Sequence, residues 1–164
     1  MEDRKAWPII GQVIFLGESP LNTHAILGAM TEELQRPKVG VGVIFVRESR
    51  VFLAKRHGAH GENTWASAGG HLERGETLEE CARREAMEEL GVIVGELRFL
   101  CVSNIIAYDK HYVDIEFLGD IGNQEPRLAE PEAFIDSGWF LLDDLPYPMF
   151  HAMRYALDSY RSGE

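Results

Sequence analysis

Two local signals define residues 78–90 as a helix, and this segment is the strongest constraint on how the chain folds. Thr77 and Glu80 stand in the Thr-x-x-Glu arrangement of a capping box, which satisfies the first free N–H groups of a helix. Gly91 follows the segment, at the position where a left-handed residue ends many helices. The sequence therefore predicts a helix with both ends fixed locally.

Three glutamates share one face of this predicted helix. Glu85, Glu88 and Glu89 stand at i, i+3 and i+4, which are neighbouring positions on a helix surface. Cys81 and Ala82 extend the same stripe one turn earlier, and an apolar stripe faces the body of a protein. A solvated acidic face would instead lie opposite that stripe. We therefore expect the carboxylates to point toward the body of the protein or a cleft.

Like charges at this spacing need compensation. They push at least one carboxylate toward protonation unless a cation intervenes. Arg84 can compensate one of them, and Mg²⁺ compensates better because it binds a few carboxylates together with substrate phosphates. Before the helix, Gly69 and Gly70 are read as a turn whose backbone lets a ligand approach closely.

The stretch from Gly70 to Val92 matches the pattern Gly-x5-Glu-x7-Arg-Glu-U-x-Glu-Glu-x-Gly-U, in which U is an apolar residue. The residues at the specified positions are Gly70, Glu76, Arg84, Glu85, Ala86, Glu88, Glu89, Gly91 and Val92. This pattern is the Nudix signature, and the chain resembles MutT-like nucleoside-triphosphate diphosphatases of the Nudix hydrolase family. The similarity covers about residues 38–160, with Ala68 in place of the proline that many members have before the paired glycines.

The resemblance implies a metal site on the predicted helix. Glu85, Glu88 and Glu89 correspond to metal-binding glutamates, and the carbonyl of Gly69 is the expected additional ligand. Arg84 would orient a ligand carboxylate and limit repulsion. The implied cofactor is Mg²⁺, with Mn²⁺ as a substitute.

The resemblance leaves the general base open between the helix and a distant loop. Glu85 is one candidate, and the acids of the loop over residues 121–133 are the other, with Glu132 placed before Glu130. Both loop acids are equally compatible with a plain acidic surface. Glu76 is expected to support the geometry between loop and helix.

Candidate substrate contacts lie outside the helix. Arg56 ends a predicted strand near the site and is read either as a phosphate contact or as a solvated strand end, and Gly70 offers close backbone approach. Asp114 interrupts an apolar strand, where a carboxylate can accept hydrogen bonds from the amino group of a base. Three aromatic residues are read as core, with a base pocket as the alternative: Tyr112, Trp139 and Phe140.

Strands and helices alternate without a regular βαβ rhythm, which favours an α/β (α+β) fold with a mixed sheet. The resemblance makes this a Nudix-type α/β/α sandwich, with the sheet between helices. Strands are expected at 39–46, 51–56, 65–68, 97–107, 111–118 and 134–142, with a last helix at 149–160. The resemblance implies a Nudix domain over residues 38–164. Residues 1–37 are expected to form a strand-helix appendage of unknown role, for which one hypothesis is homodimer formation.

Charge and composition restrict the partners. The formal net charge is −11 and the sequence pI is about 5.0, so the chain repels nucleic acid polymers, whereas bound cations still permit small phosphorylated ligands. The apolar run from Trp7 to Leu16 is too short for the ~20 residues that span a bilayer. Cys81 and Cys101 lack CxxC spacing and are read as reduced thiols. We therefore expect a cytoplasmic protein without membrane insertion.

The function implied is metal-dependent hydrolysis of a diphosphate linkage in a nucleotide-like small molecule. A nucleoside triphosphate would yield a nucleoside monophosphate and diphosphate. Nucleotide-sugar and ADP-ribose-type substrates are alternatives within the same chemistry. A further alternative is a non-catalytic nucleotide-sensing Nudix module, although all the glutamates of the signature are present.

Overall fold

The computed structural model describes residues 36–58, 60–107 and 109–163. The appendage expected over residues 1–37 lies outside these ranges except for its last two residues, so its role remains a prediction. The elements are β1 (Lys38–Ile44), β2 (Val46–Arg47), β3 (Arg50–Arg56), β4 (Trp65–Ala66), β5 (Ala68–His71), α2 (Leu78–Leu90), β6 (Leu97–Ala107), β7 (Lys110–Gly119), β8 (Phe134–Leu141) and α3 (His151–Ser162). In these ranges no helix is both long and apolar enough to cross a membrane.

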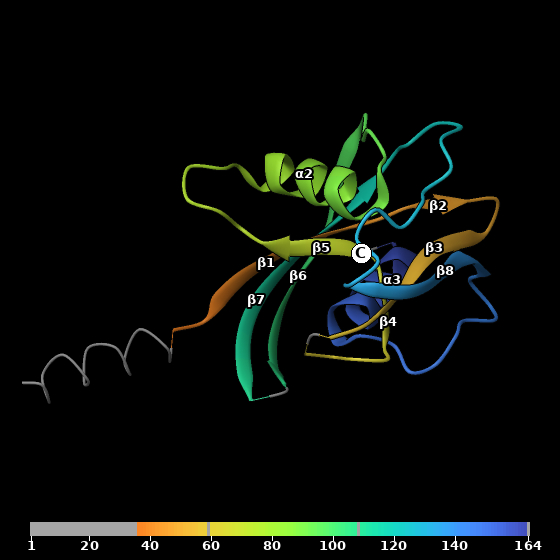
Figure 1. The fold of residues 1–164 in the computed structure, drawn as a ribbon. Coiled ribbons are helices and arrows are strands. Elements are labelled where there is room, and N and C mark those ends of the chain that lie inside the picture. The colour runs from red at the N-terminus through yellow and green to blue at the C-terminus, as the bar shows by residue number, and fades with distance from the viewer. Residues whose placement is uncertain (1–35, 59, 108, 164) are drawn as a thin grey trace, which may run out of the picture. The chain divides into compact units, whose positions relative to one another are not determined.

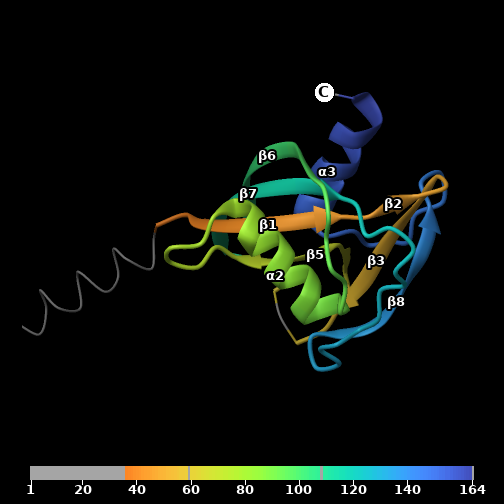
Figure 2. The ribbon, with the colours of Figure 1, turned by 90° about the horizontal axis from the view of Figure 1, so that it is seen from above.

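The strands form two four-stranded sheets. The first is a mixed sheet of order β5-β1-β7-β6, in which β1 runs parallel to β7 and antiparallel to β5. The second joins β2, β3 and β4, with β8 also paired to β3. Helix α2 lies against β5 and β1, and α3 lies against β6 and β7 (Figures 1 and 2). The expected α+β class, with a mixed sheet between helices, is confirmed.

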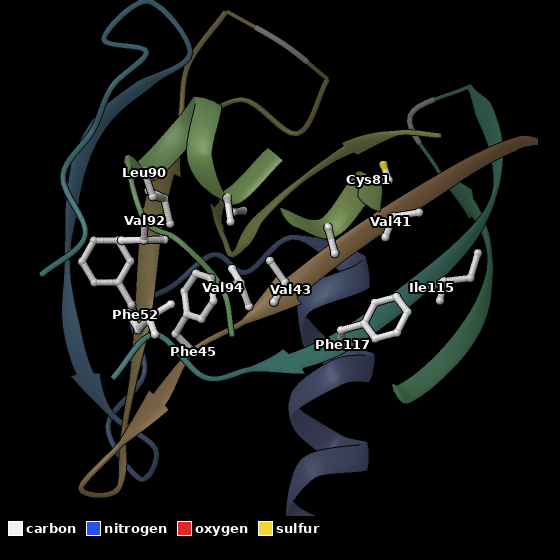
Figure 3. Close-up of a cluster of buried hydrophobic side chains, with 14 residues drawn as sticks. Val41, Val43, Phe45, Phe52, Cys81, Leu90, Val92, Val94, Ile115 and Phe117 are labelled. Carbon is white, nitrogen blue, oxygen red and sulfur yellow. The ribbon is translucent and has the colours of Figure 1, made fainter. Parts of the chain in front are cut away.

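Strand β1 is buried on both faces, as its apolar run indicates. Val41 and Val43, together with Phe45 just after the strand, pack into the cluster beneath α2, which Figure 3 shows with Leu90 at the end of that helix. Ile44 points the other way, into the cluster that includes residues of α3. Because successive side chains alternate along a strand, β1 links the two cores.

Helix α2 has the predicted limits. The Thr77 side chain accepts a bond from the Glu80 N–H, and the Glu80 side chain accepts from the Thr77 N–H, so the capping box is confirmed. Gly91 follows with φ of 64° in the left-handed region, where a residue without Cβ is favoured. Helix α3 begins two residues later than expected, because Met149 instead forms a bridge with Trp65.

The turn expected at Gly69-Gly70 is wrong. Both glycines lie inside strand β5, where Gly69 pairs with Gly42 and Gly70 pairs with Val41 of β1. Glycine weakens a strand and usually indicates a turn, but here the antiparallel pairing with a distant segment holds it extended. The chain turns after β5 instead, around Gly75, whose φ is 90°.

Candidate active site

Arg84 stands at the centre of a hydrogen-bonded cluster on α2. Its guanidinium donates to Glu76 at 2.8 and 3.1 Å, through Nε and Nη2. Its Nη1 donates to Glu85 at 2.7 Å and to Glu88 at 3.0 Å. The bonds from Arg84 hold the pKa of Glu76 at about 2, well below its usual value. These contacts are what an orienting role for Arg84 and a supporting role for Glu76 require.

Glu89 is buried at the edge of the mixed sheet. The residue is only 8% exposed, and its Oε2 accepts a 2.9 Å hydrogen bond from the Gly69 N–H. Burial raises the pKa of Glu89 to about 8; the Gly69 bond opposes the rise and the charge of Glu85 adds to it. Glu85 and Glu89 thus point inward as expected, whereas the Glu88 side chain is 49% exposed.

The paired glycines are required by packing inside the protein. A Cβ on Gly70 would collide with the carboxylate of Glu85. A Cβ on Gly69 would lie 2.6 Å from the carbonyl oxygen of Val41 in β1. The sequence indicated that the missing side chains let a ligand approach; the structure shows that a helix carboxylate and a neighbouring strand already use that space.

The helix glutamates suit a hard divalent cation by their chemistry. Glu85 and Glu88 converge on one nitrogen of Arg84. Burial raises the pKa of Glu85, and the charge of Glu88 raises it further. Within the described part of the chain, no three His, Cys, Asp or Glu side chains are already grouped to hold a metal ion. Arg84 bonds to two of the carboxylates instead, and the expected metal site remains a prediction.

The loop after β7 brings one acid toward these glutamates. The Ala129 N–H donates a 2.9 Å hydrogen bond to the carbonyl of Glu89, which ties the loop to α2. Burial is the main cause of the raised pKa values of Glu85 and Glu89, and the charge of Glu130 contributes to both. The charge of Glu130 therefore reaches both carboxylates, and the choice between Glu132 and Glu130 as the general base remains a prediction.

A pocket lies on the face of the mixed sheet that α3 covers. We call this cavity the sheet pocket. The residues that line it include Gly40, Gly42, Arg56, His60, Gly69, Gly70, His71, Tyr112, Asp114, Glu116, Phe150 and Met153. Gly69 belongs to this lining and also bonds to Glu89, so the pocket adjoins the helix glutamates. The expected substrate residues Arg56, Gly70 and Asp114 all line it.

The sheet pocket contains an acid that the sequence reading missed. Glu116 is 2% exposed and stands two residues after Asp114 on β7, on the same face of the strand. Burial raises the pKa of Asp114 to about 6 and that of Glu116 well above its usual range. Two patterns in the sequence could have indicated Glu116. Asp114 and Glu116 stand two residues apart in an apolar strand, and Gly40 and Gly42 have the same spacing in the strand that pairs with it.

The aromatic candidates divide between pocket and core. Tyr112 lines the sheet pocket and its hydroxyl lies 3.0 Å from Nε2 of His71. Trp139 packs edge-on against Phe52, and Phe140 packs against the second core cluster. The core interpretation is therefore confirmed for Trp139 and Phe140. Tyr112 is also buried in a core cluster with Ile105 and Ala152, and it lines the sheet pocket as well, so a contact with a base remains a prediction.

Comparison with known proteins agrees with this geometry. The NUDIX domain profile matches residues 36–160. A "MutT NUDIX hydrolase" structure from Burkholderia pseudomallei superposes with a TM-score of 0.72 at 39% identity, covering 76% of this chain and 98% of that one. The chain is 31% identical to the "Oxidized purine nucleoside triphosphate hydrolase" of Danio rerio, over 67% of this chain and 70% of that protein.

A second group of relatives is longer. The chain is 35% identical to the "NAD-capped RNA hydrolase NudC" of Chromobacterium violaceum over 130 residues, which is 74% of this chain and 47% of that protein. It thus spans less than half the length of the NudC proteins that it matches. The domain match and the structural match, which covers 98% of the Burkholderia pseudomallei protein, nevertheless agree with the signature on α2. This chain belongs to the Nudix hydrolase family.

Proposed function

We propose that this protein is a metal-dependent hydrolase that cleaves the diphosphate linkage of a nucleoside triphosphate or a related nucleoside-diphosphate derivative and releases a nucleoside monophosphate. The observation that carries the proposal is the convergence of Glu85 and Glu88 on Arg84, beside the buried Glu89 that bonds to Gly69. This cluster adjoins the sheet pocket, which supplies room for an organic ligand next to the acids.

Glu85, Glu88 and Glu89, with the carbonyl of Gly69, are the groups that would hold Mg²⁺, or Mn²⁺ in its place. Carboxylate and carbonyl oxygens are the ligands that such hard cations take. The chemistry that the cation supplies when bound is stabilisation of charge on phosphate oxygens and activation of water.

The protein's own side chains position the reactants and move a proton. Arg84 fixes Glu85 through a 2.7 Å bond and is itself fixed by Glu76, so the carboxylates are preorganised. Glu130 is the proposed proton acceptor for the attacking water, because its charge acts on Glu85 and its loop is bonded to α2. Arg56, which lines the pocket, is the proposed phosphate contact.

Two substrate classes deserve priority. The Danio rerio relative, of which this chain matches 70%, acts by its name on oxidised purine nucleoside triphosphates. The NudC relatives are by their name hydrolases of NAD-capped RNA. Molecules with an NAD-type linkage, including NAD-capped RNA, are therefore a second candidate substrate class. The net charge of −11 disfavours the RNA chain itself as a partner, so we place the free nucleotide first.

The test is a panel of canonical and oxidised nucleoside triphosphates, NAD, NAD-capped RNA, ADP-ribose and nucleotide sugars, each incubated with Mg²⁺ and analysed by chromatography. We expect metal-dependent release of a nucleoside monophosphate from at least one compound, and its loss in Glu88→Gln. Tight nucleotide binding without turnover across the panel would instead support the nucleotide-sensing alternative and reject the enzyme.

A further inference from the structure

The loop after β7 supplies hydrogen-bond donors to the last turn of α2. The Ala129 N–H donates to the carbonyl of Glu89 at 2.9 Å, and the Arg127 N–H donates to that of Leu90 at 3.0 Å. The last carbonyls of a helix have no partner inside it, so the loop fills acceptors that the helix leaves open. Glu130, the proposed proton acceptor, directly follows the first of these contacts.

The side chain of Gln124 adds a third contact between the loop and the end of the helix. Its Oε1 accepts a 2.9 Å hydrogen bond from the Ile93 N–H, and its Nε2 donates to the Ile93 carbonyl at 2.8 Å. Nε2 also donates to the carbonyl of Ile121 at 2.9 Å, within the loop. Because a carboxamide carries donors and an acceptor on one planar group, this side chain pairs with the backbone of Ile93 as a neighbouring strand would.

The three contacts follow one another in antiparallel order along the two segments. They join Glu89 to Ala129, Leu90 to Arg127, and Ile93 to Gln124. Ile121 and Leu128 of the loop also pack against the core cluster beneath α2, but apolar packing has no preferred direction. The hydrogen bonds therefore set the register of the loop along the helix. Two of these contacts are made by backbone groups alone, so the contact that depends on a side chain is that of Gln124.

The segment that Gln124 contacts is itself fixed to α2. Arg83, on the helix, donates to the carbonyl of Val94 at 3.3 Å and to that of Gly95 at 3.0 Å. The Ile93 side chain is 68% exposed, so apolar packing does not hold the chain at this point. Hydrogen bonds from Arg83 and Gln124 therefore connect the helix, this segment and the loop.

Arg47 of β2 holds the same stretch of the loop to the second sheet. Its Nη2 donates at 2.8 Å to the carbonyl of Gly122 and to that of Gln124, and its Nη1 donates to Glu125 at 2.7 Å. The guanidinium lies 4.8 Å from the centre of the Trp139 ring, and Nε1 of Trp139 donates to Glu125 at 3.1 Å. Gln124 is thus bonded through its backbone and through its side chain.

We propose that Gln124 is a positioning residue for the hydrolysis, which fixes the register of the loop after β7 along α2 and thereby keeps Glu130 beside the helix glutamates. A proton acceptor works only within hydrogen-bond reach of the attacking water, so a small shift of the loop is costly. Gln124 acts through Glu130 and not on the substrate. The inference rests on the proposed function, because it assumes that Glu130 accepts a proton there.

The first measurement compares kcat and KM of Gln124→Ala, Gln124→Glu and Asn123→Ala with those of the wild type. Gln124→Glu keeps the size of the side chain but places an oxygen against the carbonyls of Ile93 and Ile121. We expect kcat to fall at least about tenfold in both Gln124 variants with little change in KM, since misplacement by about 1 Å can cost roughly 10²-fold. Asn123→Ala changes the exposed neighbour in the loop and should keep the wild-type kcat.

A double-variant cycle separates positioning from a general effect on stability. If Gln124 acts through Glu130, Gln124→Ala should lower kcat by less than about twofold once Glu130→Gln is present, because the acid that it positions is gone. A decrease as large in the Glu130→Gln protein as in the wild type would overturn the inference. An unchanged kcat in folded Gln124→Ala and Gln124→Glu would overturn it as well.

Hydrogen exchange of the metal-free protein tests the same contact without turnover. We expect the amides of Arg127 and Ala129 to exchange at least about tenfold faster in Gln124→Ala than in the wild type, and at the wild-type rate in Asn123→Ala. Equal exchange in all three proteins would overturn the inference, even in an active enzyme. Faster exchange in Gln124→Ala, in a protein whose wild type hydrolyses no nucleotide, would reject the proposed function and leave the hold of Gln124 on the loop intact.

Discussion

The backbone N–H of Gly69 donates a 2.9 Å hydrogen bond to the carboxylate of Glu89, which lies 20 residues further along the chain. The bond joins strand β5 to the last turn of α2. It places the carboxylate of Glu89, the most buried glutamate of the signature, beside the lining of the sheet pocket. The geometry of the pocket edge and that of the helix glutamates are therefore coupled.

The burial of Glu89 predicts a pH-dependent stability in metal-free protein. Its folded-state pKa is raised to about 8, above the value near 4.5 expected when unfolded. A group with a raised folded-state pKa contributes stability that is fully present below the unfolded pKa and is lost as the pH rises through the folded pKa. We expect Tm in chelator to fall by several degrees between about pH 5 and pH 8.

Glu89→Gln should flatten this fall, because the amide does not titrate. Glu79→Gln, on the exposed face of the first turn, should leave it intact. Thermal denaturation at four pH values distinguishes the two variants. A wild-type Tm that rises steadily over the same interval would contradict the assignment.

The fit between Gly70 and Glu85 predicts a loss of activity from one methyl group. In Gly70→Ala the new Cβ would occupy the position of the Glu85 carboxylate, which must then move away from Arg84. We expect kcat to fall by at least about tenfold, as expected for misplacement of a positioned group. Gly95→Ala is the matched control, since its Cβ would meet only Asp120 O at 3.6 Å. Steady-state kinetics with equal loss in both variants would refute the specific role of Gly70.

The two loop acids are expected to differ in the reaction. Removal of a general base costs about 10²–10⁴-fold in rate. Because the charge of Glu130 acts on Glu85 and Glu89, Glu130→Gln should show a loss of this order in kcat, and Glu132→Gln should not. The measurement is kcat against pH for both variants. A larger loss of kcat in Glu132→Gln than in Glu130→Gln would instead identify Glu132 as the general base.

The capping box should contribute measurably to stability. Thr77→Ala removes the oxygen that accepts the Glu80 N–H and should cost about 1 kcal/mol. In a domain of this size that corresponds to a decrease in Tm of roughly 2–4 °C. Thr77→Ser keeps the oxygen and should recover most of the loss. Calorimetry showing equal Tm values for wild type and Thr77→Ala would contradict the capping role.

The sequence predicted what local signals determine. Helix α2 follows from Thr77, Glu80 and Gly91, all within one turn of its ends. The inward orientation of Glu85 and Glu89 follows from helical spacing together with the apolar stripe of Cys81 and Ala82, whereas the same reasoning was wrong for the half-exposed Glu88. A signature with fixed positions then identified the family before any long-range contact was known.

The sequence did not predict features that depend on pairing between distant segments. The strand at Gly69-Gly70 exists because β1 holds it, and glycine by itself favours a turn. Asp114 was singled out while Glu116 was not, because their partners Gly40 and Gly42 are defined only by the parallel register of β1 and β7. The second sheet likewise depends on β8 pairing with β3, far apart in the chain.

The most direct test of the proposed function is the Mg²⁺-dependent kcat of three proteins on the best nucleotide of the panel: wild type, Glu89→Gln and Glu79→Gln. Loss of a metal-binding carboxylate removes several kcal/mol of transition-state stabilisation. We therefore predict a decrease of at least about 100-fold in Glu89→Gln, since each 1.36 kcal/mol is tenfold in rate, and an unchanged kcat in Glu79→Gln. Equal Mg²⁺-dependent turnover in wild type and Glu89→Gln would contradict a catalytic centre at the glutamates of α2.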